Sequence, residues 1–252
     1  MNRPRVALLA ASLLLTGCGG GAVASPGHPT GAATARSSTP TISPLASPSP
    51  QMSVEAAALQ LPGLGLRTLA EIPADARQAV VVTGRGENSP RSTVVLYERT
   101  TVGWQAGASW PAHNALKGWS AHHTAGDLRS PVGVYGLTDA GGLLGDPGTR
   151  LPYTHSGGFT SPGTGFGGES LAGSFDYVVA INYNRKPGTS PLDWTRPMGA
   201  SRGGGIWFHV DHGGPTHGCV SIAEKHMKEL LRALDPDLHP VVVMGDATSL
   251  AR

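Results

Sequence analysis

The sequence predicts a mainly β protein with one amphipathic helix. The chain of 252 residues contains 36 glycines and 21 prolines, and only 6% of its residues are aromatic. Short β-branched runs recur between turns rich in glycine, proline, asparagine and aspartate, a pattern that favours strands. Only one stretch near the C-terminus has apolar residues at helical spacing. This combination favours a strand-rich domain over a helical bundle.

The N-terminus has the pattern of a secretory signal peptide. Two arginines precede an apolar run over 6–15, and Leu15-Thr16-Gly17-Cys18 forms a cleavage site. The run is shorter than the roughly 20 residues of a membrane-spanning helix. Leu-Thr-Gly-Cys resembles the bacterial lipoprotein box, so we expect 1–18 to be a lipoprotein signal peptide and Cys18 to carry the lipid. The alternative is an ordinary cleaved signal peptide; both predict export, and lipidation predicts anchoring to the outer face of the cytoplasmic membrane.

Two further segments follow the signal. Residues 19–52 consist mainly of Ser, Thr, Pro, Ala and Gly, and such a composition cannot bury enough apolar surface to fold. We interpret them as a disordered tether that extends on the order of 3 Å per residue. Residues 53–252 have the size of one domain. The net charge of +2 is spread without clusters, which argues against a nucleic-acid partner, and we expect a monomer.

The elements of the domain are expected in a simple order. A short helix is expected over 55–61, and 64–79 is ambiguous. Strands over 79–83 and 92–99 form a hairpin, and 101–105 pairs next. Further strands are predicted at 132–137, 177–183, 205–210 and 241–244. The amphipathic helix covers 224–234, with Met227, Leu230, Leu231 and Leu234 on one face, and Pro236 ends it.

A single thiol stands in the glycine-rich stretch 206–222. Cys219 is the only cysteine besides Cys18, so it has no disulfide partner within the mature chain. A nucleophilic cysteine needs a nearby base or dipole, because its ordinary pKa is near 8.5. The helix predicted just after Cys219 would supply a dipole. His209 at a strand end and His217 two residues before the thiol are the candidate bases; the sequence favours His209 without settling the choice.

The turn around the thiol has residues suited to acyl transfer. Gly218 allows close approach of the backbone, and the N–H groups of Gly218 and Cys219 are candidates to stabilise an oxyanion. Thr216 either orients a histidine or closes the turn with its hydroxyl.

Thr216-His-Gly-Cys219, preceded by an apolar-apolar-His strand, resembles the signature of the L,D-transpeptidase catalytic domain, the YkuD-like family. The stretch 126–137 is similar to the Gly-Asp-x-x-Thr-Pro-x-Gly segment of that family. The resemblance implies a β-sandwich-like fold, no cofactor, and a reaction on peptidoglycan stem peptides. Cys219 would attack the carbonyl that joins the third residue, a diamino acid, to the terminal D-Ala. An amine of a second stem would then take the acyl group.

The same resemblance implies contacts to the substrate from Tyr153, His212 and Ser221. The family often has an arginine after its cysteine, whereas here Val220-Ser221-Ile222 follows, so a carboxylate contact made by that arginine is missing or supplied elsewhere. The spacing from His209 to the cysteine is also short. Both departures resemble an actinobacterial lipoprotein branch.

The residues are compatible with three other interpretations. His209, His212, His217 and Cys219 could bind zinc, although no distant ligand completes the set. The domain could bind peptidoglycan without cutting it, or water could replace the amine, which would make the enzyme an L,D-carboxypeptidase. The pair His122 and His123 could line the cleft, but it is interpreted as solvated loop histidines.

Overall fold

The computed structural model describes residues 60–252. The predicted signal peptide (1–18), the lipidation residue Cys18, the tether (19–52) and most of the helix predicted at 55–61 lie outside the described residues. Within 60–252, no helix is both long enough and apolar enough to cross a membrane.

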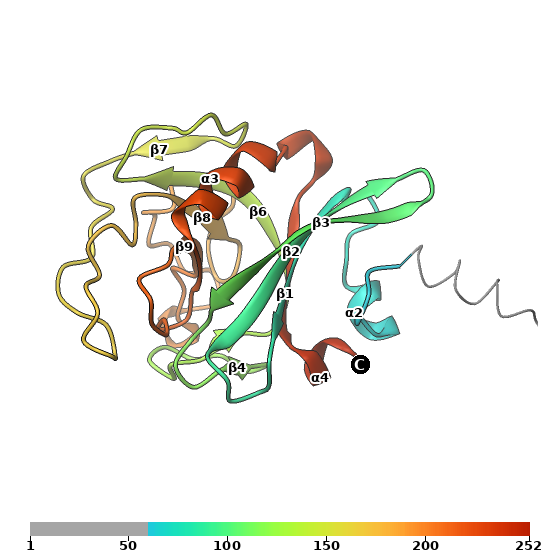
Figure 1. The fold of residues 1–252 in the computed structure, drawn as a ribbon, viewed down its shortest axis with the longest axis horizontal. Coiled ribbons are helices and arrows are strands. Elements are labelled where there is room, and N and C mark those ends of the chain that lie inside the picture. Colours follow the sequence, from blue (N-terminus) through green and yellow to red (C-terminus); the bar gives the residue numbers. More distant parts are fainter. Residues whose placement is uncertain (1–59) are drawn as a thin grey trace, which may run out of the picture. The chain divides into compact units, whose positions relative to one another are not determined.

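The main sheet contains nine strands and closes on itself (Figure 1). Its order is β11-β1-β2-β3-β10-β9-β8-β6-β7, and β11 also pairs with β6, which completes a ring of eight strands with β7 beside β6. The mainly β class is confirmed. The sheet is a barrel rather than two stacked sheets, because β6 is long enough to pair with β11 at one end and with β8 and β7 at the other. The strands are β1 (Gln78–Gly84), β2 (Arg91–Thr100), β3 (Gly103–His113), β6 (Gly133–Gly142), β7 (Tyr153–His155), β8 (Val178–Ile181), β9 (Trp207–Val210), β10 (Val220–Ile222) and β11 (Val241–Asp246).

The predicted strands are present, with shifted ends. β1 and β2 form the expected hairpin, and β3 pairs with β2 as expected but extends to His113. Strand β10 was not predicted. A separate small sheet joins β4 (Trp119–Ser120) to β5 (Ser130–Pro131).

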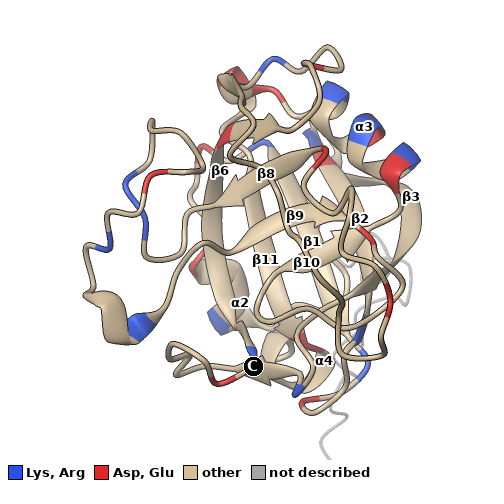
Figure 2. Cartoon of the chain, turned by 90° about the vertical axis from the view of Figure 1, so that its left-hand side faces the viewer, with Lys and Arg blue, Asp and Glu red and all other residues tan. Residues whose placement is uncertain are grey.

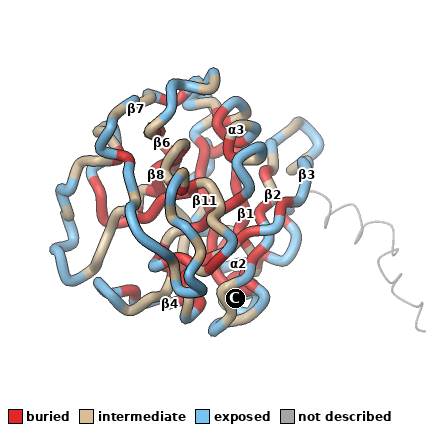
Figure 3. The backbone as a smooth tube through the Cα atoms, turned by 60° about the vertical axis from the view of Figure 1, so that its left-hand side comes forward, coloured by how far each residue is buried: buried red, intermediate tan, exposed pale blue. Residues whose placement is uncertain are grey.

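Continuous apolar runs form strands that are covered on both faces. Val80 and Val82 of β1 point into the barrel, whereas Ala79 and Val81 pack outside it in a second cluster. Short helices α2 (Leu66–Ala70) and α4 (Ala247–Leu250) lie at the two ends of the domain sequence, and the N–H of Gly65 donates to the carbonyl of Leu250. Figure 3 shows the buried strands enclosed by exposed loops. Strands buried on both faces read as unbroken hydrophobic runs.

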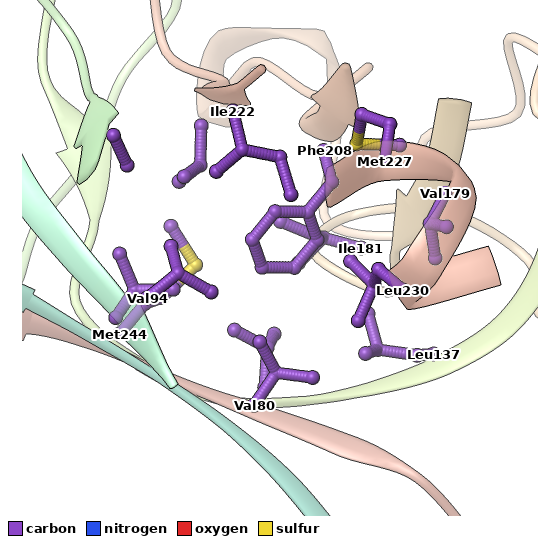
Figure 4. Close-up of a cluster of buried hydrophobic side chains, with 14 of the residues drawn as sticks. Val80, Val94, Leu137, Val179, Ile181, Phe208, Ile222, Met227, Leu230 and Met244 are labelled. Atoms are coloured by element: carbon purple, nitrogen blue, oxygen red, sulfur yellow. The ribbon is translucent and has the colours of Figure 1, made fainter. Parts of the chain in front are cut away.

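The predicted amphipathic helix is α3 (Glu224–Ala233). Its apolar face carries Met227, Leu230 and Leu231, which are fully buried in the main core. Figure 4 shows Met227 and Leu230 beside Phe208 and Ile181 in this cluster. Interiors of eight-stranded barrels are filled by side chains, and α3 completes this filling. Charged residues are dispersed over α3 and the loops rather than gathered on one element (Figure 2).

Candidate active site

The loop from β9 to β10 carries the thiol and is anchored at its base. The N–H of Asp211 donates to the carbonyl of Ile222 at 2.8 Å. The Asp211 carboxylate accepts hydrogen bonds from the Ser221 hydroxyl at 2.7 Å and from His113 Nδ1 at 2.8 Å. Burial raises the pKa of Asp211, but the two hydrogen bonds, the charge of His113 and the N–H of Gly213 together hold the pKa below its ordinary value. A carboxylate therefore fastens the start of the loop to β10 and β3.

The end of the loop is closed by Thr216. Its hydroxyl donates to the carbonyl oxygen of Cys219 at 2.7 Å, and its N–H donates to the carbonyl of Asn114 at 3.0 Å. Ser130 donates a second hydrogen bond to the Cys219 carbonyl at 3.3 Å. Thr216 thus closes the turn, the second of the two roles considered for it, and fixes the backbone on both sides of the thiol.

Cys219 is a free, half-buried thiol. Its Sγ accepts from the N–H of Trp207 at 3.4 Å and donates to the carbonyl of Gly205 at 3.5 Å. Burial raises the pKa of the thiol to about 11, and the Trp207 N–H lowers it only in part. The resting state is therefore a thiol rather than a thiolate.

The helix begins at Glu224 as predicted, but the expectation that its dipole acts on Cys219 is wrong. Strand β10 follows the cysteine, and α3 begins at Glu224. The dipole of a helix acts within about its first turn, so α3 does not act on this sulfur. β10 forms here because Val220 and Ile222 are apolar and pack into the core on either side of the buried Ser221.

His209 lies on β9 and is only 3% exposed. Phe208 of the same strand points into the core, so Trp207 and His209 both point to the opposite face, where Cys219 packs against the Trp207 cluster. Nδ1 of His209 donates to the carbonyl of Val210 at 2.9 Å, which leaves Nε2 as the proton-accepting nitrogen. Burial lowers the pKa of His209 to about 4, so its ring is neutral at pH 7. Within the described residues, no histidine is hydrogen-bonded to the sulfur.

The ring of His209 is packed between other rings. His212 stacks on it, with centroids 5.7 Å apart and planes 8° apart, and Phe175 meets it edge-on. His212 Nδ1 lies 3.2 Å from the carboxylate of Glu169. These contacts fix the orientation of the His209 ring from two sides.

A pocket of about 540 Å³ opens beside the thiol. Its wall contains Cys219, His217 and Gly218 from one loop and Trp194 and Arg196 from another. A volume of roughly 300–1,000 Å³ is usual for ligand sites. His217 is exposed and packs on Phe166, with ring centroids 4.6 Å apart.

A second buried imidazole lies in the pocket wall and was missed from the sequence. His123 is 5% exposed and lines the pocket, whereas its neighbour His122 is exposed. Its Nδ1 lies 2.9 Å from Asp127, and Tyr183 packs against its ring edge-on. Burial lowers the pKa of His123, against the opposing effect of Asp127. The Asp127 at i+4 was the sequence signal that could have singled out His123 from the pair.

Backbone N–H groups beside the thiol remain available. Within the described residues, neither the N–H of Gly218 nor that of Cys219 donates a hydrogen bond. A Cβ added at Gly218 would lie 2.9 Å from Ile206 and 3.8 Å from His123, so glycine keeps this side of the pocket open. Unpaired N–H groups next to a nucleophile can stabilise the oxyanion of an acyl-transfer reaction.

The three residues expected to contact substrate lie outside this pocket. Ser221 is fully buried and donates to Asp211, and His212 stacks on His209 with its Nδ1 3.2 Å from Glu169. Tyr153 donates its hydroxyl to the carbonyl of Leu144, and burial raises its pKa. The described residues contain no group of three or more His, Cys, Asp or Glu side chains that could hold a metal ion, so the zinc interpretation finds no ligand set there.

One protein-family model matches most of the chain. The model of the L,D-transpeptidase catalytic domain, YkuD, matches residues 76–243. The chain therefore belongs to the L,D-transpeptidase catalytic domain family. The matched residues contain the whole barrel up to β11 and every pocket residue named above.

Two solved structures are similar to this chain at low identity. Bd1075 of Bdellovibrio bacteriovorus is 18% identical with a TM-score of 0.39, and the match covers 74% of this chain and 53% of that one. The helical cell shape determining protein Pgp2 from Campylobacter jejuni is 17% identical with a TM-score of 0.40, and the match covers 68% and 48%. The chain thus spans about half the length of each, and both are too distant to bear on its function. No curated protein sequence matches the chain.

Proposed function

We propose that this protein is a cysteine-dependent L,D-transpeptidase that acts on peptidoglycan stem peptides. The observation that carries the proposal is the free thiol of Cys219, which lines a peptide-sized pocket beside the unpaired N–H groups of Gly218 and Cys219 in a member of this family. A domain that only binds peptidoglycan has no need of this arrangement.

The reaction has two acyl-transfer steps. The sulfur attacks the carbonyl of the diamino acid as the thiol proton passes to an imidazole, and the N–H groups of the turn receive the oxyanion. The C–N bond then breaks, D-Ala leaves with that proton on its amine, and a thioester remains. A side-chain amine of a second stem attacks the thioester and forms the cross-link, and the thiol regains its proton.

His209 is our choice for the base. Its Nε2 carries a lone pair, its ring is neutral at pH 7, and it shares a sheet face with Cys219. A neutral imidazole can accept the thiol proton during attack, so a preformed thiolate is not needed. In this scheme His217 and His123 line the pocket and contact the substrate.

The full protein is proposed to work outside the cytoplasm. Lipid on Cys18 would anchor it to the outer face of the cytoplasmic membrane, and residues 19–52 would let the catalytic domain reach the cell wall as a monomer. A labelled acyl chain on the wild-type protein, absent from Cys18→Ser, is the measurement that tests the anchor.

Mass analysis of the products tests the reaction. With a disaccharide tetrapeptide, the proposal expects free D-Ala and cross-linked dimers. Tripeptide without dimers would instead identify an L,D-carboxypeptidase, since water would then take the acyl group. No product, together with no adduct on Cys219 after incubation with a carbapenem, would leave the domain as a peptidoglycan binder.

A further inference from the structure

Arg196 lies in the pocket wall without an acidic partner. No Asp or Glu lines the pocket, and Arg196 forms no ion pair within the described residues. Its Nη1 donates to the carbonyls of Asp193 and Thr195, whereas its Nε and Nη2 donate to no described residue. Burial lowers the pKa of Arg196, with Asp193 opposing the shift. A partly buried guanidinium with free donors is an unused binding site for an anion.

Arg196 and Cys219 both lie next to Gly205. A Cβ added at Gly205 would lie 3.5 Å from Arg196 Nη2, and the carbonyl of Gly205 accepts from Cys219 Sγ at 3.5 Å. At roughly 3.5 Å per extended residue, no more than about three residues of peptide separate the guanidinium from the sulfur. A group bound by Arg196 therefore belongs to the part of a peptide next to the attacked carbonyl.

Trp194 covers the outer side of the guanidinium. The Cζ of Arg196 lies 4.8 Å from the centroid of the Trp194 ring, which is 72% exposed. The Arg196 side chain also packs on Gly204, where a Cβ would come within 2.2 Å of Nε. The guanidinium is thus in contact with an indole ring and with bare backbone, and its Nε and Nη2 groups keep free donors.

The loop that carries Arg196 is braced at both ends. Arg185 is buried and pairs with Asp139 at 2.9 Å. Asn184 donates to the carbonyls of Gly199 at 3.0 Å and Gly203 at 2.6 Å, and it accepts from the N–H of Met198 at 2.7 Å. A ligand would then bind to a guanidinium already held in place, and such preorganisation favours affinity.

We infer that Arg196, backed by Trp194, binds a peptide carboxylate adjacent to the scissile bond and so selects anionic stem peptides. This inference rests on the proposed function and names the substrate feature that the site recognises. Arg196 would also make, from a different loop, the carboxylate contact that the Val220-Ser221-Ile222 sequence after the cysteine does not offer. Two carboxylates qualify: that of the terminal D-Ala, and the second carboxylate that some diamino acids carry.

Binding to the full chain carrying Cys219→Ala tests the inference without turnover. Isothermal titration compares the free-acid tetrapeptide with two amides, one at the terminal D-Ala and one at the diamino acid. We expect R196Q to weaken binding of the free acid by about 10- to 100-fold, as for a lost charge-assisted hydrogen bond. R196K should recover part of the loss, because it restores the charge without the fork. R202Q, on the same loop but outside the pocket wall, should bind normally.

The two amides identify the carboxylate. Amidation of the bound carboxylate should weaken binding by the same factor, and R196Q should then cause no further loss. Three results would overturn the inference. They are equal binding of all peptides by the Cys219→Ala protein with and without R196Q, an equal loss from R196Q with both amides, and no binding at millimolar peptide. D-Ala release that is indifferent to Arg196 would remove this site and leave the proposed function intact. Arg196-dependent binding without D-Ala release by the wild type would support the Arg196 site and contradict the proposed function.

Discussion

The hydroxyl of Thr216 donates to the carbonyl oxygen of Cys219 at 2.7 Å and so closes the turn that presents the thiol. The peptide bond that follows Cys219 is therefore held by a side chain three residues earlier. Among the described residues, the sulfur of Cys219 forms hydrogen bonds only with backbone groups, the N–H of Trp207 and the carbonyl of Gly205.

Thr216→Val should loosen this turn. The valine keeps the shape but leaves the buried carbonyl of Cys219 with only the weaker bond from Ser130. We expect a loss of about 1 kcal/mol in the free energy of unfolding in urea, together with slower D-Ala release. Thr216→Ser retains the hydroxyl and serves as the control. Unchanged stability and rate in the valine variant would mean that this hydrogen bond does not hold the turn.

The burial of His209 predicts a stability that depends on pH. The unfolded chain protonates this imidazole near pH 6.5, whereas the folded chain does so only near pH 4. The free energy of unfolding is therefore unaffected by this group above pH 6.5. It decreases as the pH falls from 6.5 to 4, by up to about 3 kcal/mol, because the unfolded chain binds the proton more readily. Denaturant unfolding across this range should show a steeper decline for the wild type than for His209→Gln. Parallel curves would indicate that His209 is accessible to protons in the folded state.

The thiol of Cys219 should react slowly with iodoacetamide at pH 7. Its pKa is raised to about 11 by burial, so the alkylation rate should keep rising above pH 9, where an ordinary cysteine has levelled off. Cys18→Ser leaves a single thiol for this measurement. A half-maximal rate near pH 8.5 would show an ordinary exposed thiol, and a half-maximal rate below pH 7 would show a preformed thiolate.

His123 should matter to the reaction although it precedes the thiol by 96 positions, the difference between 219 and 123. It lines the pocket, and its Nδ1 lies 2.9 Å from Asp127, so Nε2 is the nitrogen available for a substrate hydrogen bond. His123→Ala should lower kcat/KM for D-Ala release by about tenfold, the effect of one hydrogen bond. His122→Ala, at the exposed neighbour, is the matched control. Equal effects of the two variants would reduce His123 to a packing role.

Much of the fold was predictable because local patterns and tertiary structure agree. The valine runs of β1 and β11, the glycine turns between strands, and the spacing of Met227, Leu230 and Leu231 in α3 each indicate their element without reference to the rest. Strand β10 was not predictable, because three residues carry no period and its partners β3 and β9 are distant in sequence or separated by a loop. Barrel closure depends on the β6–β11 pairing, which is equally long-range.

The site was predictable only near the signature. Cys219, Thr216, His217 and Gly218 are neighbours in sequence, and the structure keeps the last two beside the thiol in the pocket wall. His123 and Arg196 come from other loops, and a single sequence carries no signal that brings them together with Cys219. Ser221 was expected in the site because it is polar and close to the thiol in sequence. The structure instead places its hydroxyl in a hydrogen bond with Asp211.

Intact-protein mass spectrometry during turnover tests the central claim most directly. With the tetrapeptide substrate, the account predicts a wild-type adduct that lacks the mass of D-Ala, located on Cys219 by peptide mapping and absent from Cys219→Ala. His209→Ala should slow its formation more than His217→Ala does. D-Ala release by Cys219→Ala, or an adduct on a different residue, would contradict the account.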